Sequence, residues 1–160
     1  MAVSPVSSVI IAPHTESIVL KLVDIFSKKK LNKSLAQNVA ITLGRLGLIN
    51  PEAVAKHLEK IAKQWCVSLR FLKNNNDEKY QAYKGLCYTI GRNSFAMMSQ
   101  LAYFCSAIVH YKNPRTELDE IFRGIMMAFK QTHGDEQAWR TYIDQYPEDL
   151  KRQLIQRNYV

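Results

Sequence analysis

The sequence predicts an all-α protein in which helix pairs stack into a solenoid, about three pairs followed by a short carboxyl-terminal helical tail. Three observations predict this fold. Apolar residues recur with the 3.6-residue period of helices in one segment after another, while no segment alternates as a strand does. Short sequence echoes return after about 40 residues, the length of a two-helix repeat. Small residues stand inside the helical patterns, where neighbouring helices can approach closely.

Length and composition indicate one ordered domain outside the membrane. The chain has 160 residues, 47% of them hydrophobic, with six Gly and five Pro. This is far from the polar, Pro- and Gly-rich composition of disordered segments. The longest apolar stretches, such as 121–129, fall short of the roughly 18 to 20 residues that a membrane crossing needs. Residues 1–13 lack the basic start of a secretory signal, so we expect an intracellular protein.

The first predicted helix pair covers 18–26 and 34–48. Ile18, Leu22 and Ile25 give the first helix its apolar stripe, and Asn50-Pro51 ends the second. The second pair covers 51–73, which begins with proline at a first turn, and 78–90, which follows the polar run 74–77.

The third predicted pair covers 94–111 and 116–132. Asn93 or Ser94 can cap its first helix, because a short side-chain oxygen accepts the free amide hydrogens of a first turn. Thr116, with Asp119 three residues later, resembles a capping box that opens the second helix, and Gly134 can end it in a left-handed conformation. The tail, 135–158, predicts two short helices broken at Pro147.

Sequence echoes give the repeat its class. Thr-Leu-Gly-Arg at 42–45 returns as Thr-Ile-Gly-Arg 47 residues later, and Tyr-Lys-Gly-Leu at 83–86 returns as Phe-Arg-Gly-Ile 39 residues later. These offsets bracket the HEAT and armadillo repeats, which have periods of about 40 to 47 residues. Glycine inside a helix costs about 1 kcal/mol relative to alanine, and close packing between stacked helices would offset that cost. The glycines concerned are Gly44, Gly47, Gly85, Gly91 and Gly124.

Three cysteines, Cys66, Cys87 and Cys105, each stand inside an apolar helical pattern. Their odd number and their surroundings favour reduced core thiols over a disulfide framework. Cys87 or Cys105 with His110 could form a nucleophile and base, but a buried thiol near a surface histidine is the better interpretation.

No catalytic, metal-binding or cofactor-binding residues are predicted, and we expect a protein that is not an enzyme. The sequence lacks the glycine-rich phosphate loops and the paired Cys or His motifs of metal sites. The four histidines do not share a helical spacing that would make a ligand set, and the two tryptophans fit core positions. These residues are His14, His57, His110 and His133, with Trp65 and Trp139.

The net charge of +8 leaves a basic nucleic-acid binder as an alternative. The one dense cluster of lysines, at 28–30 and 33, falls where the first helix ends. Lysines at that place complement the helix dipole and solvate a loop, so we favour a solvated loop over a phosphate site.

Several runs of the chain resemble a known family. They are NVAITLGRLG at 38–47, WCVSLR at 65–70, Phe104-Cys105 and Asn113-Pro114, and the spacing continues through Pro147 to the end. They resemble the carboxyl-terminal end of the transportin family, the karyopherin-beta 2 group of importin-beta-type nuclear import receptors. The resemblance implies a poorly matched segment at 1–13 and a carboxyl-terminal HEAT-repeat domain at 14–160.

The resemblance implies a receptor that carries cargo through nuclear pores and shuttles between cytoplasm and nucleus. Its cargo would bear nuclear localisation signals of the proline-tyrosine type, often on RNA-binding proteins. These signals would bind the inner helices, which are the second helices of the pairs. The cargo-binding residues would be Asn38, Ile41 and Arg45. Ran GTPase and nucleoporins would bind through parts of a full receptor that this sequence lacks, and the net positive charge predicts weak affinity for a basic signal.

Two further expectations concern the ends of the domain. The charged finish of the chain, with Glu148, Asp149 and Arg157, leaves open a purely structural role as the end cap of a solenoid. At the other end, the first helix should expose apolar surface through which copies of the chain associate. Its residues would be Val19, Leu22, Val23 and Phe26. No membrane contact is expected.

Overall fold

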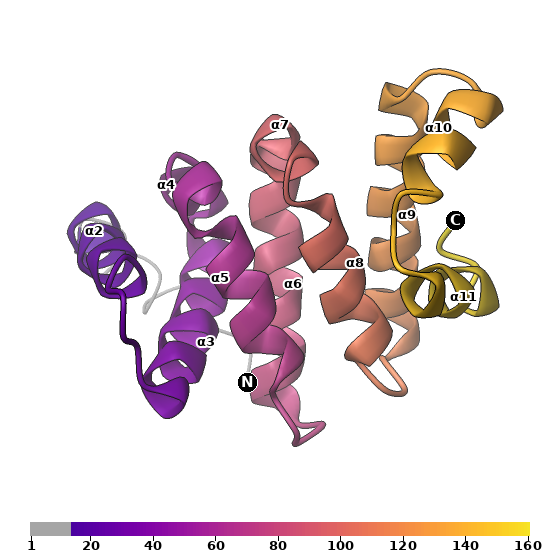
Figure 1. Cartoon of the computed structure of the whole chain (residues 1–160). Helices are drawn as coiled ribbons and strands as arrows, with labels where there is room; N and C mark the ends of the chain where they lie inside the picture. The colour runs from indigo at the N-terminus through magenta and orange to yellow at the C-terminus, as the bar shows by residue number, and fades with distance from the viewer. Residues whose placement is uncertain (1–13) are drawn as a thin grey trace.

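The computed structural model describes residues 14–160, and every regular element within that range is a helix. The segment 1–13, for which a poor family match was expected, lies outside the described residues. Figure 1 shows the helices following one another across the molecule in chain order. They are α2 (Thr15–Phe26), α3 (Lys33–Ile49), α4 (Pro51–Ala55), α5 (Leu58–Arg70), α6 (Asp77–Arg92), α7 (Ser94–Met98), α8 (Leu101–His110), α9 (Thr116–Thr132), α10 (Glu136–Ile143) and α11 (Glu148–Gln156).

The helices form three pairs and a tail, as the sequence predicted. The pairs are α2 with α3, α4–α5 with α6, and α7–α8 with α9. The most extensive contact between neighbouring pairs joins the second helices α3 and α6, and the outer helices α5 and α8 pack on each other. Because α2 and α9 lie on opposite sides of the row, the molecule is an open stack and not a closed bundle (Figure 1). This arrangement confirms the all-α helical-repeat solenoid.

Glycines hold the backbones of α3 and α6 against each other. A Cβ atom on Gly85 would lie 1.7 Å from the carbonyl oxygen of Gly44, and one on Gly44 would lie 2.4 Å from the Cα atom of Ala82. Any side chain at either position would therefore overlap the facing backbone. The expected role of glycine in close packing is confirmed here, and it also holds for Gly47.

The same expectation is wrong for Gly91 and Gly124. A Cβ atom at either position would meet no atom within 4 Å, because both glycines are exposed. Between the second halves of α6 and α9 lies an apolar hollow of about 180 Å³, lined mainly by Ile90, Ile125 and Phe129. The stack is thus tight between its first two inner helices and loose between the second and third.

Two of the predicted helices are each broken into two. The predicted helix 51–73 is α4 and α5, separated at His57, and the predicted helix 94–111 is α7 and α8, separated at Gln100. Val54 and Leu58 on either side of the first break are both fully buried. The break lets two short helices each turn an apolar face to the core, which one straight helix would not do.

The helix ends confirm some of the predicted signals and correct one. The side chain of Asn93 caps α7 by accepting a hydrogen bond from the amide of Ala96 at 3.3 Å. Gly134 follows α9 with a φ of +98°, as predicted. The capping box at Thr116 is wrong, because α9 already includes Thr116 and its N-cap residue, Arg115, makes no side-chain cap.

Buried polar groups tie neighbouring pairs together. The indole of Trp65 donates to the carbonyl of Ala40 at 3.0 Å, and the hydroxyl of Tyr83 donates to the carbonyl of Ala107 at 3.1 Å. Both side chains are fully buried. The three cysteines are free and buried, which confirms the prediction of reduced core thiols.

The two ends of the stack differ. At the carboxyl-terminal end, the guanidinium of Arg157 donates to the carbonyl of Val109 in α8 (3.1 Å) and to that of Tyr111, the residue that follows α8 (2.8 Å). At the amino-terminal end, the expected exposure of Val19, Val23 and Phe26 is wrong. All three are buried and Leu22 is partly buried, because they join the core beneath α2.

Candidate functional site

Helix α3 presents the three residues that the sequence indicated for cargo binding. The side chain of Asn32 caps the helix by accepting from the amides of Ser34 and Leu35 at 2.9 and 3.2 Å. From this fixed start, Asn38, Ile41 and Arg45 follow at intervals of three and four residues, so they share one side of the helix. Asn38 and Arg45 are exposed, whereas Ile41 is only 7% exposed.

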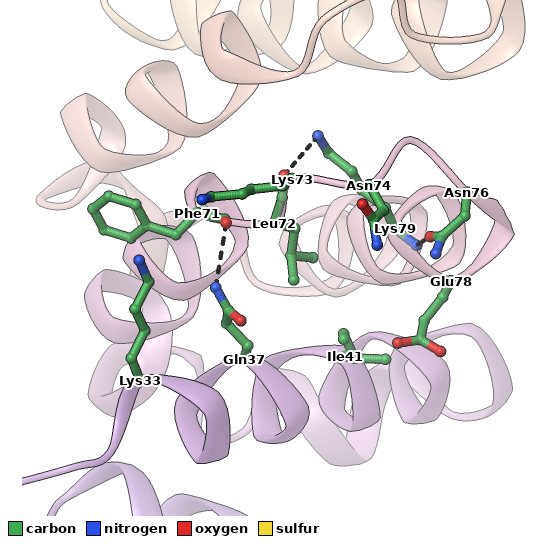
Figure 2. Close-up of a pocket in the computed structure, with 10 residues that line it drawn as sticks. All are labelled: Lys33, Gln37, Ile41, Phe71, Leu72, Lys73, Asn74, Asn76, Glu78 and Lys79. Atoms are coloured by element: carbon green, nitrogen blue, oxygen red, sulfur yellow. Dashed lines mark hydrogen bonds between the residues drawn. The ribbon is translucent and has the colours of Figure 1, made fainter.

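Ile41 forms part of a pocket of about 340 Å³, the Ile41 pocket, which opens between α3, the α5–α6 connection and the start of α6. Figure 2 shows Ile41 beside Glu78 at one end of this pocket and Lys33 beside Phe71 at the other. The amide of Gln37 donates to the carbonyl of Phe71 at 3.2 Å, which fixes the connection against α3. The pocket therefore combines an apolar wall, a carboxylate and cationic groups.

Glu78 links the predicted residues to the pocket. Its carboxylate forms an ion pair with Arg45 at 3.2 Å, and the two side chains are 45% and 49% exposed. An ion pair this open to solvent contributes little to stability, so the carboxylate remains available to a competing cation. The structure thus brings Ile41 and Arg45 together around Glu78. Asn38 lies on the same side of α3 but does not line the pocket.

Lys79 lines the Ile41 pocket and is held in place by two contacts. Its ammonium donates to the carbonyl of Leu72 at 3.0 Å and lies 4.4 Å from the centre of the Tyr111 ring. Burial lowers the pKa of Lys79. Sequence reasoning missed this lysine together with Gln37 and Glu78. The four-residue spacing of Lys33, Gln37 and Ile41 could have identified the α3 side of the pocket, but nothing local connects it to α6.

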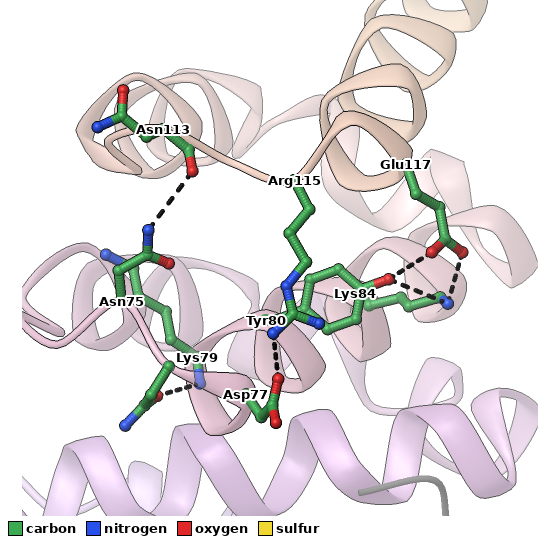
Figure 3. A network of polar contacts seen from close by, with 9 residues as sticks. Asn75, Asp77, Lys79, Tyr80, Lys84, Asn113, Arg115 and Glu117 are labelled. Atoms are coloured by element: carbon green, nitrogen blue, oxygen red, sulfur yellow. Dashed lines mark hydrogen bonds and ion pairs between the residues drawn. The ribbon is translucent and has the colours of Figure 1, made fainter.

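A polar network joins α6 to α9 beyond the pocket (Figure 3). Glu117 accepts a hydrogen bond from the hydroxyl of Tyr80 at 2.6 Å and pairs with the ammonium of Lys84 at 2.7 Å. The hydrogen bonds from Lys84 and Tyr80 lower the pKa of Glu117, and that carboxylate raises the pKa of Lys84. Arg115 lies 4.2 Å over the Tyr80 ring and pairs with Asp77. The network fixes the first halves of α6 and α9 relative to each other.

The described residues offer no readily ionised thiol and no metal-binding cluster. Burial raises the pKa of the Cys66 thiol to about 12 and also raises the pKa of Cys87 and Cys105. A thiol that stays protonated is a poor nucleophile and a poor metal ligand. Within 14–160, no cluster of three His, Cys, Asp or Glu residues could hold a metal ion, and no helix could span a membrane.

Comparison with known proteins identifies relatives. Over 142 residues, or 89% of the chain, it is 37% identical to Transportin-1 of Mus musculus and to Transportin-1 of Homo sapiens. Over 120 residues, or 75% of the chain, it is 34% identical to Importin subunit beta-2 of Schizosaccharomyces pombe. The chain spans 16% of the length of the two Transportin-1 proteins and 13% of that of Importin subunit beta-2. No protein-family model matches the chain.

Proposed function

Because the chain belongs to the transportin group of the importin-beta family and corresponds to the carboxyl-terminal part of such a receptor, we propose that it contributes a binding surface for nuclear localisation signals of cargo proteins. The Ile41 pocket is the observation that supports this role. Its apolar wall and the carboxylate of Glu78 suit a segment in which an apolar residue stands next to a basic one. Asn38, Ile41 and Arg45 are the proposed cargo-binding residues.

The same proposal includes the partners of a whole receptor. The signals are of the proline-tyrosine type, many of them on RNA-binding proteins, and Ran GTPase and nucleoporins bind to other parts of the receptor. The receptor acts without catalysing a reaction and shuttles between cytoplasm and nucleus. All of this rests on the family, since the chain spans 16% of the Transportin-1 length.

Binding to this chain alone should be weak. A fully buried apolar side chain contributes about 1.5 to 3 kcal/mol, whereas micromolar affinity needs about 8 kcal/mol. Ile41 is already only 7% exposed in the free chain, so a ligand buries little more of it. The pocket thus supplies one contact among the several that a signal needs.

Calorimetric titration with a proline-tyrosine signal peptide tests the proposal. We expect a dissociation constant weaker than about 10 μM, and a further loss of about threefold for Glu78→Gln, which changes a half-exposed carboxylate and should not affect folding. Ile41→Ala should also weaken binding. Glu59→Gln, on an exposed residue of α5, is the charge-matched control. If Glu78→Gln, Ile41→Ala and the control variant all bind the signal peptide with the same affinity, the Ile41 pocket is not the binding site.

A structural end cap is the second candidate. The observation in its favour is that Arg157 donates to carbonyls at the end of α8, while the outer side of α11 carries the exposed Glu148 and Asp149. A solenoid needs such a polar end, because a terminal repeat has no neighbour to cover it. This role and cargo binding can coexist, since they use opposite ends of the chain.

A further inference from the structure

Cations without an acidic partner gather at one edge of the stack. Most of the ion pairs of the described residues lie elsewhere, as in Lys84 with Glu117 and Lys130 with Glu136. At the edge where the α2–α3 connection passes the end of α5, no described carboxylate lies within 4 Å of the basic side chains. We call this the lysine edge. Its members are Lys28, Lys29, Lys30, Lys33, Arg70 and Lys73.

A groove runs along the lysine edge. A second pocket, of about 250 Å³, lies between the start of α3 and the end of α5, and its apolar wall consists of Leu31, Ala36 and Val67. It adjoins the Ile41 pocket, since Lys33 and Phe71 line both. Figure 2 shows these two side chains together at the end of the Ile41 pocket. The two neighbouring pockets, with Lys33 and Phe71 between them, are together called the groove, and its apolar wall lies in the second pocket.

Phe71 holds cations at the centre of this groove. The ammonium of Lys33 lies 4.7 Å from the ring centre and the guanidinium carbon of Arg70 lies 5.4 Å from it. The ring is 44% exposed. Such cation–π contacts orient the charged groups without neutralising them, so both charges remain available to an incoming anion.

We propose that this groove binds an acidic peptide segment that carries an aliphatic side chain. Carboxylates of the peptide pair with the lysine edge, and the aliphatic group enters the pocket walled by Leu31, Ala36 and Val67. The charge complementarity identifies the partner. The side chains that line the two pockets include three lysines and one carboxylate, Glu78.

Two features favour a peptide over a nucleic acid as the occupant. Binding of single strands relies on aromatic rings that stack on bases, but Lys33 and Arg70 already lie against Phe71. A sugar-phosphate backbone also has no apolar group that would occupy the pocket beside this wall, whereas a leucine or valine side chain would fill that pocket. The inference goes beyond the proposed function, because an acidic segment would bind at the lysine edge, whereas a basic signal would bind at Glu78.

Fluorescence anisotropy with the full chain tests the inference. The probe is a labelled peptide that repeats Glu-Glu-Leu, at about 0.15 M salt, where surface charges are screened beyond about 8 Å. Lys28→Glu combined with Lys30→Glu should weaken binding at least tenfold. Lys60→Glu combined with Arg152→Glu changes the net charge equally, on exposed residues of α5 and α11 that line neither pocket, and should weaken binding less than threefold.

The apolar part of the groove has its own test. A peptide of the same length made of glutamate alone should bind at least fivefold more weakly, and Phe71→Ala should weaken the Glu-Glu-Leu peptide. Three outcomes would overturn the inference: no saturable binding up to about 1 mM peptide, an equal loss in the charge-matched control, or tighter binding of oligouridylate that depends on the same lysines. The proline-tyrosine signal titration keeps the two proposals apart, because the Lys28 and Lys30 substitutions should not weaken signal binding.

Discussion

Two glycines with matching sequence neighbours have opposite surroundings. Gly44 and Gly91 stand in the echoed Thr-x-Gly-Arg runs, yet a Cβ atom would collide with backbone at the first and meet empty space at the second. The same four-residue pattern recurs, but only Gly44 faces a neighbouring helix at contact distance. A local sequence therefore cannot tell which glycine is required.

The first prediction is that Gly85→Ala is destabilising. The new methyl group would lie 1.7 Å from the carbonyl oxygen of Gly44, so α3 and α6 must move apart, and we expect a loss of about 3 kcal/mol. Gly124→Ala is the matched control. It adds the same methyl group where nothing lies within 4 Å and should stabilise by about 1 kcal/mol through helix propensity. Urea unfolding measures both, and similar midpoints for the two variants would contradict the packing described for α3 and α6.

The second prediction concerns the cysteines. Burial raises the pKa of all three thiols and leaves little thiolate to react. A thiol reagent added to the native protein at pH 8 should label them only as fast as the protein unfolds. The urea-unfolded chain, in which all three react quickly, is the control. Rapid native labelling of Cys66, Cys87 and Cys105 would show that these side chains are accessible.

At the scale of the helix, the sequence predicted the number and order of the pairs and missed two breaks. Apolar spacing continues without interruption through His57 and through Gln100, and neither place has a Gly or Pro to mark it. What breaks each helix is the need to bury apolar residues against two neighbours at once, which is a tertiary effect. Asn93 could be identified as a cap because its hydrogen bond is local.

The third prediction concerns the contact between α6 and α9. Glu117→Gln removes the ion pair with Lys84 and should lower the urea midpoint at pH 7. The pKa of Glu117 lies below its ordinary value of 4.5, so its contribution is present above pH 4.5 and is lost as the pH falls through the folded-state pKa. The difference between wild type and variant should therefore shrink in acid. Glu120→Gln, on an exposed residue of the same helix, is the control and should leave the urea midpoint at pH 7 unchanged. A constant difference between wild type and Glu117→Gln down to about pH 3 would contradict the role of Glu117.

At the scale of the whole molecule, more of the fold than of the candidate site could be predicted from the sequence. Repeat offsets and helix periods describe a stack, because each repeat contacts only its neighbours. The Ile41 pocket needs α3 and the start of α6, whose Glu78 lies 33 residues from Arg45. Pairing such distant residues requires the spacing between helices, which no periodicity in one sequence supplies. Ile41 itself was identified only through the family resemblance.

The fourth prediction is self-association through the amino-terminal helix. Since Val19, Val23 and Phe26 are buried, the apolar residue that α2 presents to a second copy is Leu20, which is 52% exposed. Leu20→Glu should keep the chain monomeric at concentrations where the wild type associates, as measured by sedimentation velocity. Ile155→Glu, at the other end of the stack and 62% exposed in wild type, is the matched control and should leave association unchanged. A wild type that remains monomeric at millimolar concentration would contradict the prediction.

The hollow between α6 and α9 has a mechanical consequence. Backbone contact at Gly44 and Gly85 makes α3 and α6 one stiff block, since sliding or tilting would drive atoms into each other. Between α6 and α9, the Glu117 network holds one end and the hollow of about 180 Å³ leaves the other end without support. A bending load on the stack should therefore change the angle between α6 and α9 before it moves α3 against α6.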